Sequence, residues 1–272
     1  MVLYATNIVL IRYSVLNGLT ALDLAALRYA VSGAVLLPYL CRSGLVDLGG
    51  IGWPRGVVLA SLAGAPYIVV FFYGLRLAPA AHGAVLNTGI VPSVVFLGLV
   101  VLGRQPFSLT RALSLLSIVV GLVFVTGSSF STQGPVVFGD MLLFLTGVSW
   151  GLFTLFARMW ELKPLLATAV VSVLSLVYLP VYVILYYGGF EGASITHLVL
   201  QALFQGFVLS IGTVYLVTYA VRTLGPQLAA LFSPAVPLLT TLLAIPLLGE
   251  IPTPAQWVGI ACVVVGMLCA AR

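Results

Sequence analysis

The segment YGLRLAPAAHGAVLNTGIVPS, residues 73–93, recurs in altered form as YAVRTLGPQLAALFSPAVPLL, residues 219–239. Both segments are apolar, and both carry an arginine at their fourth position. At the same offset of 146 residues, further matches occur at Arg12 and Arg158, Gly103 and Gly249, and Pro106 and Pro252, while Tyr4 meets Trp150. Several matches at one offset are typical of a duplicated unit. We therefore expect two related halves, residues 1–130 and residues 131–272.

The composition indicates that lipid surrounds most of the chain. Of the 272 residues, 62% are hydrophobic and 6% are charged, whereas soluble domains carry about 25% charged residues. The net charge is +5, but the basic residues are scattered singly between apolar runs, which argues against nucleic-acid binding. Three cysteines lie in apolar runs without metal-ligand spacing. The sequence is therefore an all-α membrane protein.

Ten apolar runs are candidate membrane spans, for which about 20 residues are needed. They are expected near residues 1–16, 24–41, 55–76, 79–102, 107–127, 138–158, 164–187, 196–222, 225–248 and 253–271. The first run is short, and we expect either a native chain that begins upstream of Met1 or a trimmed start. The connections are short, and no separate soluble domain is expected.

The orientation follows from the basic residues, which favour cytoplasmic loops. With a cytoplasmic N-terminus, the cytoplasmic side carries Arg42, Arg55, Arg104, Arg111, Arg158, Lys163, Arg222 and Arg272, and the other side carries Arg12, Arg28 and Arg76. We expect a monomeric, multi-pass inner-membrane protein with both termini in the cytoplasm. Because each half has five spans, the halves are inverted relative to each other, an arrangement typical of alternating-access transporters.

Several motifs resemble those of one transporter family. They are SWG at residues 149–151, LAALRYAVSGAVLL at 24–37 and LLGEIPTPAQWVGIACVVVGM at 247–267. With ten spans and the inverted repeat, they resemble the EamA branch of the drug/metabolite transporter superfamily over essentially the whole chain. The first half departs from that pattern, with Arg104 in place of a Glu and Tyr4-Ala5 in place of Trp-Gly. Within the branch, the chain is similar to YddG-type aromatic amino acid exporters.

The distribution of ionisable residues excludes several functions. No acid is expected in the middle of a span, and Asp140 is expected at the start of the sixth. Buried lysines or arginines for a phosphorylated substrate are also lacking, because Arg12, Arg76, Arg158 and Arg222 lie near span ends. The sequence has no HExxH motif and no phosphate loop. We expect no enzyme, no cofactor and no metal site.

Polar and aromatic side chains inside the spans are the candidates for substrate binding. Neutral or zwitterionic substrates need hydrogen-bonding groups and apolar walls. The candidates are Tyr67, Phe71, His82, Asn87, Trp150, Thr154, Tyr215 and Ser233. His82 and Asn87 lie ~140° apart around their helix, so one face cannot present both. For each residue, helix packing or an interfacial position is the alternative interpretation.

Two prolines, Pro92 and Pro237, lie at nearly equivalent positions of the halves and are candidate hinges.

We expect a transporter that exports small neutral metabolites by alternating access. Its expected substrates are amino acids, with aromatic ones first. No buried acid supports obligatory proton antiport, although His82 leaves a proton role open. The alternatives are broad efflux of hydrophobic or cationic compounds, and a receptor or scaffold without transport.

Overall fold

The computed structural model describes residues 1–127, 134–186, 194–224 and 232–270. These residues form ten apolar helical segments: α1 (Val2–Leu16), α2 (Ala21–Ser43), α3 and α4 (Trp53–Ala63, Ala65–Leu77), α5 and α6 (Ala80–Gly89, Val91–Val101), α7 (Leu109–Gly127), α8 (Gly134–Met159), α9, η2 and α10 (Pro164–Leu174, Ser175–Val177, Tyr178–Leu185), α11, η3 and α12 (Ile195–Gln201, Ala202–Gly212, Thr213–Leu224), α14 (Ala235–Leu248) and α15 (Pro254–Ala270). Seven segments are long and apolar enough to cross a membrane, and α1, α14 and α15 are shorter. The expected ten-helix architecture is confirmed.

Prolines explain where several segments are broken, because proline lacks an N–H and clashes with the preceding turn. Pro66 is the second residue of α4 and follows the break at Gly64. The N–H of Ala65, freed by that break, donates to the Ser175 hydroxyl (3.1 Å). Pro92 is likewise the second residue of α6, after the break at Ile90. Pro237, in contrast, lies in the first turn of α14, and residues 225–231 before it lie outside the described residues.

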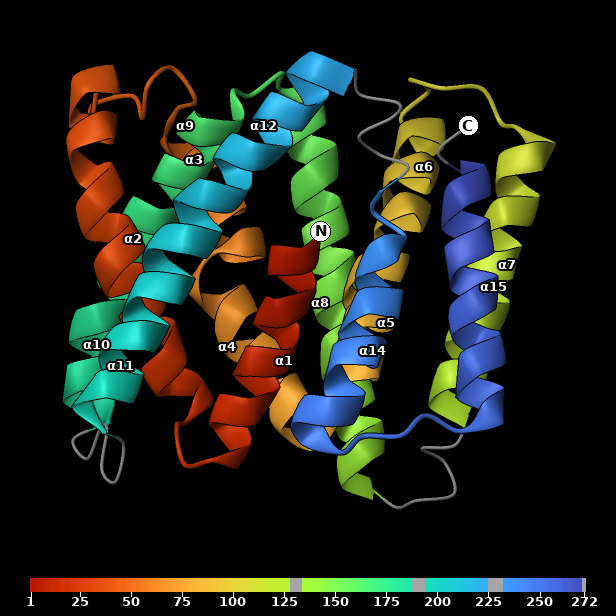
Figure 1. Cartoon of the computed structure of the whole chain (residues 1–272). Helices are drawn as coiled ribbons and strands as arrows, with labels where there is room; N and C mark the ends of the chain where they lie inside the picture. The colour runs from red at the N-terminus through yellow and green to blue at the C-terminus, as the bar shows by residue number, and fades with distance from the viewer. Residues whose placement is uncertain (128–133, 187–193, 225–231, 271–272) are drawn as a thin grey trace.

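The packing of the segments follows the duplication. The equivalent segments α7 and α15 pack against each other, as do α2 and α9. α1 packs against α14, and its equivalent α8 packs against α5 and α6. Figure 1 shows α7 and α15 together on one side of the bundle, with α2 and α10 on the other. Gly103 and Gly249, which follow equivalent segments, have matching left-handed φ values of +65° and +69°.

Glycines allow α7 and α15 to approach closely. A Cβ added to Gly121 would lie 2.5 Å from the carbonyl oxygen of Gly259, and one added to Gly259 would lie 2.7 Å from that of Gly121. Small residues at such crossings are typical of helix packing in membranes, where dispersion contacts replace the hydrophobic effect. The seam between these two helices is therefore intolerant of larger side chains.

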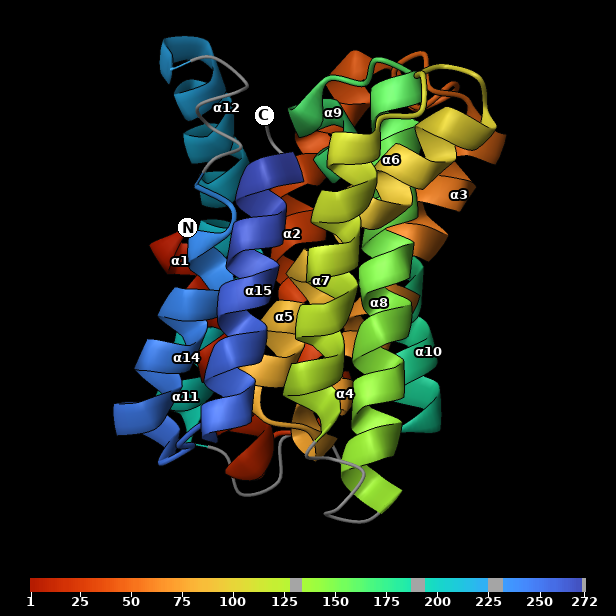
Figure 2. The same ribbon diagram turned by 90° about the vertical axis from the view of Figure 1, so that its right-hand side faces the viewer.

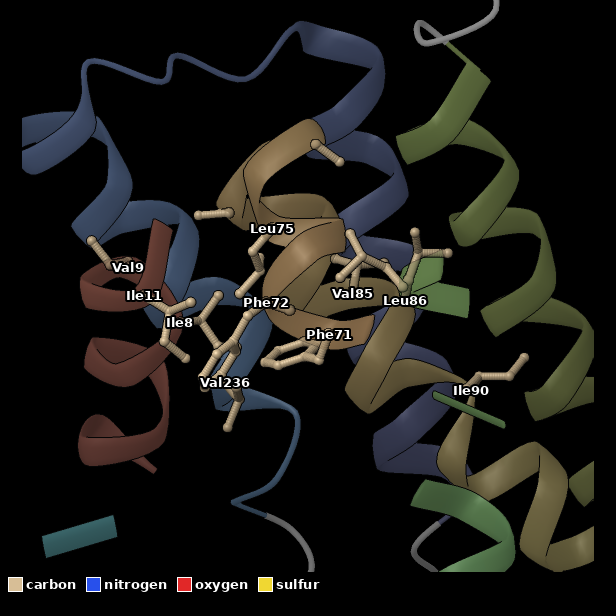
Figure 3. Close-up of a cluster of buried hydrophobic side chains, with 14 of the residues drawn as sticks. Ile8, Val9, Ile11, Phe71, Phe72, Leu75, Val85, Leu86, Ile90 and Val236 are labelled. Atoms are coloured by element: carbon tan, nitrogen blue, oxygen red, sulfur yellow. The ribbon is translucent and has the colours of Figure 1, made fainter. Parts of the chain in front are cut away.

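The largest buried apolar cluster lies where α1, α4, α5 and α14 meet. Figure 3 shows side chains of these helices converging, with Phe71 and Phe72 from α4 and Val236 from α14. The outer surface is also apolar, and Val101, Leu185 and Ile251 are at least 78% exposed. An apolar interior beneath an apolar surface is expected of a helical bundle in a bilayer.

Basic residues gather at the end of the bundle where α8 ends and α9 begins, which we call the basic end. Seven described residues lie there: Arg42, Arg55, Arg104, Arg111, Arg158, Lys163 and Arg222. Arg12 and Arg76 lie toward the opposite end, and Arg272 lies outside the described residues. Arg28, which the charge count placed on one side of the membrane with Arg12 and Arg76, lies inside a span as the eighth residue of α2. The capping box of Thr20 and Asp23 starts that helix earlier than expected.

Candidate functional site: a central aromatic cavity

A cavity of about 800 Å³ lies between α1, α2, α8, α9, η3 and α12. Four aromatic side chains line it: Tyr4, Tyr29, Trp150 and Phe153. The rings of Trp150 and Phe153 pack with their centroids 5.0 Å apart. Tyr4 and Trp150, which match under the sequence offset, thus line one space from the two halves. A concave site of this size and lining suits a small molecule with an apolar body.

The cavity reaches the basic end of the bundle. Its outermost lining residues include Arg158, Pro164 and Arg222, all exposed. In the other direction its lining stops at Asn7 of α1 and Arg28 of α2. One wall is α12, which packs against η3 and α9 and has no buried residue. Figure 2 shows the end of α12 standing apart from α15.

Two polar residues at the deep end of the cavity, Asn7 and Arg28, are joined by the buried side chain of Gln205 behind the lining. Arg28 Nη1 donates to Gln205 Oε1 (3.3 Å), and Gln205 Nε2 donates to Asn7 Oδ1 (2.8 Å). Gln205 is fully buried and belongs to η3, which is π-helical. Such wider turns frequently mark functional positions. The Ser210 hydroxyl donates to the Gln205 carbonyl, five residues earlier (3.1 Å).

Asn87 forms a buried hydrogen-bond centre behind the aromatic wall. Its Oδ1 accepts from the Tyr4 hydroxyl (3.1 Å), and its Nδ2 donates to the Tyr67 hydroxyl (3.0 Å) and to Thr146 Oγ1 (3.2 Å). Asn87 is inaccessible to solvent. It therefore fixes the position of Tyr4, which lines the cavity, and joins the first half to α8 of the second.

An ion pair closes the end opposite the basic end. Arg12 Nε donates to Glu250 Oε1 (2.8 Å), and its Nη1 donates to the carbonyls of Leu75 and Arg76 (both 2.7 Å). Glu250 Oε2 accepts from the backbone N–H of Ala80 (2.7 Å). We call this arrangement the latch, and this end the latched end. The latch ties α1, α4 and α5 of the first half to the loop between α14 and α15 of the second.

A second polar cluster lies at the latched end. His82 Nδ1 lies 2.8 Å from Asp140 Oδ1, and His82 Nε2 lies 2.9 Å from Gln256 Nε2. If Nδ1 donates to the carboxylate and Nε2 accepts from the amide, both ring nitrogens are satisfied. Asp140 lies deeper than expected, because α8 begins at Gly134 rather than residue 138. This cluster also joins the two halves.

Among the residues that the structure describes, the basic end has no counterpart of the latch. By the offset, Arg12 corresponds to Arg158 and Glu250 to Arg104. Arg104 and Arg158 line one pocket of about 470 Å³, together with Arg111 and the exposed Glu161. Two arginines stand where an ion pair would be needed, and like charges disfavour approach. The two ends of the bundle are therefore electrostatically unequal.

The structure places only two of the eight candidate residues on the cavity wall, Trp150 and Thr154. Tyr67 and Asn87 form the layer behind it, and Tyr67 packs on Trp150 with centroids 5.5 Å apart. Phe71 is stacked on Tyr67 within the core (6.0 Å). His82 lies at the latched end. The remaining two do not reach the lining.

Tyr215 and Ser233 lie outside the cavity lining. On α12, the lining residues are Thr213, Val214, Val217, Thr218 and Val221. At about 100° per residue, Tyr215 lies on the opposite face from Val217, and it is 68% exposed. Ser233 is half-buried in the turn before α14.

The residues missed from the sequence are Asn7, Arg28, Tyr29 and Phe153. Arg28 carried a usable signal, because charged residues inside membrane spans are rare and mark functional sites. Counting Arg28 only toward the charge of one membrane side hid that signal. Tyr4 was visible as the repeat partner of Trp150 but was not selected as a site residue.

Comparisons with known proteins agree with the fold. A sequence model described as the EamA-like transporter family matches residues 1–127 and 137–272. A solved crystal structure, described only as that of a protein, is similar with a TM-score of 0.62 at 20% identity, over 98% of this chain and 95% of the other. No curated protein matches the chain significantly.

Proposed function

Because the chain belongs to the EamA-like transporter family, and is a multi-pass membrane transporter rather than an enzyme, we propose that it exports amino acids, aromatic ones first. The observation that carries this proposal is the cavity of about 800 Å³ with four aromatic side chains in its lining. Offset stacking and edge contacts with such rings favour a planar apolar substrate. Asn7, Ser172 and Ser210 supply hydrogen-bonding groups for its polar part.

Alternating access is the mechanism that the arrangement supports. The cavity lies between segments of both halves, reaches the basic end and stops short of the latched end. Breaking the latch while the basic end closes would present the same cavity to the other side. The basic residues favour a cytoplasmic basic end, so this conformation would load substrate from the cytoplasm.

We propose downhill flux without obligatory proton exchange. The cavity lining contains no aspartate or glutamate among the described residues, and antiporters commonly use such a group as proton carrier. His82 and Asp140 lie at the latched end, away from the lining.

Broad efflux of hydrophobic compounds is the second candidate, because most of the lining is apolar. Cationic compounds are disfavoured in particular. The charged residues of the lining are Arg28, Arg158 and Arg222, all of one sign. Aromatic rings alone can bind a cation, but here they share the cavity with three positive charges.

Counterflow of radiolabelled tryptophan into liposomes that contain the purified protein tests the proposal. Phenylalanine should block the uptake, whereas glycine and a quaternary ammonium dye should not. Trp150→Ala should reduce uptake strongly, while Trp53→Ala, at an exposed tryptophan outside the cavity, should not. Uptake of the dye without uptake of tryptophan would refute the proposal and favour broad efflux.

A further inference from the structure

Arg28 is a charged group deep in the cavity, and no described acidic residue pairs with it. Its described partners are neutral, namely Gln205 (3.3 Å) and the Tyr29 hydroxyl. Gln205 is held in place by its own bond to Asn7 (2.8 Å). A guanidinium has five N–H donors, so most of its donor capacity remains for a ligand.

The acids that could neutralise Arg28 are engaged or distant. Glu250 pairs with Arg12, and Asp140 with His82. Asp23, on the same helix, accepts from the Thr20 N–H and from the Tyr182 hydroxyl. Asp47 and Glu161 are exposed at the basic end, and Glu191 lies outside the described residues. A charge inside a membrane span is costly unless it is paired or faces a cavity, so Arg28 is placed to receive an anion.

We infer that Arg28 anchors the carboxylate of the substrate and that the site takes aromatic monocarboxylates whether or not they carry an amino group. The inference rests on the proposed function and deepens it. A guanidinium binds a carboxylate through two parallel hydrogen bonds. Tyr4, Tyr29 and Trp150 line the space above it and would hold the ring.

Because the described lining contains no acidic residue, the amino group of a substrate would contribute little to binding. An ammonium group would have hydrogen-bond acceptors in Asn7 and Ser172, but no opposite charge. Arg158 and Arg222 at the mouth attract anions and repel cations. A phosphorylated substrate, with its larger charge, would need more buried cations than Arg28 alone.

Three ligands that differ by one group each make the test. L-Phenylalanine has both groups, 3-phenylpropionate lacks the amino group, and phenethylamine lacks the carboxylate. Radiolabelled 3-phenylpropionate should enter loaded liposomes, and unlabelled L-phenylalanine should compete, while phenethylamine competes at least about 10-fold more weakly. Arg28→Gln removes one charge-assisted contact, so it should lower the apparent affinity for 3-phenylpropionate about 10- to 100-fold. It should also remove the preference for 3-phenylpropionate over phenethylamine. Arg28→Lys should keep the preference in part.

Arg42→Gln is the matched control, because Arg42 lies on the same helix but is exposed and outside the cavity. Uptake of L-phenylalanine that 3-phenylpropionate does not inhibit and that Arg28→Gln does not change would overturn the inference and leave the proposed function intact. Uptake of 3-phenylpropionate without L-phenylalanine would support carboxylate binding by Arg28, but it would overturn the indifference to the amino group and refute amino acid export. Uptake of phenethylamine or inhibition by chloride alone would overturn the inference. If the variants do not fold, the wild-type preference decides.

Discussion

Glu250→Gln is the change that tests the latch most directly. Glu250 accepts two hydrogen bonds, from Arg12 (2.8 Å) and from Ala80 N–H (2.7 Å), and its side chain is 19% exposed. A glutamine side chain has one acceptor oxygen and one NH2 group. Its NH2 group would therefore face one of the two donors, and that hydrogen bond would be lost. Bonds to charged groups contribute about 1.5–3 kcal/mol each. We therefore expect the substitution to destabilise the closed conformation of the latched end by about 2–3 kcal/mol relative to the open conformation.

That loss shifts the ratio of closed to open molecules by about 30- to 150-fold. A population closed in about 99 of 100 molecules would become open in at least about a quarter of them. Spin labels at Asn17 and Ile251, exposed positions on either side of the latch, would report this as a second, longer distance in double electron–electron resonance. Cys41, Cys262 and Cys269 would first be replaced by serine.

Asp47→Asn, which removes an exposed acid at the basic end, is the control for the loss of one negative charge. A Glu250→Gln protein that transports but shows the parent's distance distribution would refute the view that the latch holds this end closed.

Three further predictions follow from other parts of the bundle. Arg104→Glu places an acid opposite Arg158 and should stabilise closure of the basic end, seen as slower labelling of a cysteine at Thr154; unchanged labelling would contradict this. Gly121→Ala should lower thermal stability by about 1–3 kcal/mol, because its Cβ would lie 2.5 Å from a backbone oxygen, whereas Gly127→Ala, where nothing lies within 4 Å, should not. Replacing Pro92 and Pro237 together with alanine should slow transport without unfolding the protein, and unchanged transport would show that bending there is unimportant.

The bundle was predictable because hydropathy decides membrane spans. Lipid supplies no hydrogen bonds, so each crossing must be helical, and the ten expected runs match the observed segments. The duplication was visible for a similar reason, since Gly103 and Gly249 occupy equivalent turns. The fold thus depends on local composition and on spacing along the chain.

The site was predicted less well, because it depends on contacts between distant segments. The helical period places residues on faces of α12, but it does not tell which face lines the cavity. Tyr215 lies on the face that points away from it. His82 and Asp140 are 58 residues apart, and the sequence around neither residue predicts their contact. Phe71 shares a face with Tyr67 as expected, but that face packs into the core rather than the cavity.

The unequal ends record how far the two halves have diverged since the gene duplicated. If two copies of the second half were to assemble in opposite orientations, each end would bring Arg158 near Glu250, so that both ends could latch. Two copies of the first half would bring Arg12 near Arg104 at both ends, and neither could. The ancestral duplication product, with one charge pattern in both copies, would have had equal ends. The acid-to-base difference between positions 250 and 104 is therefore enough to make the two halves no longer interchangeable at the latch.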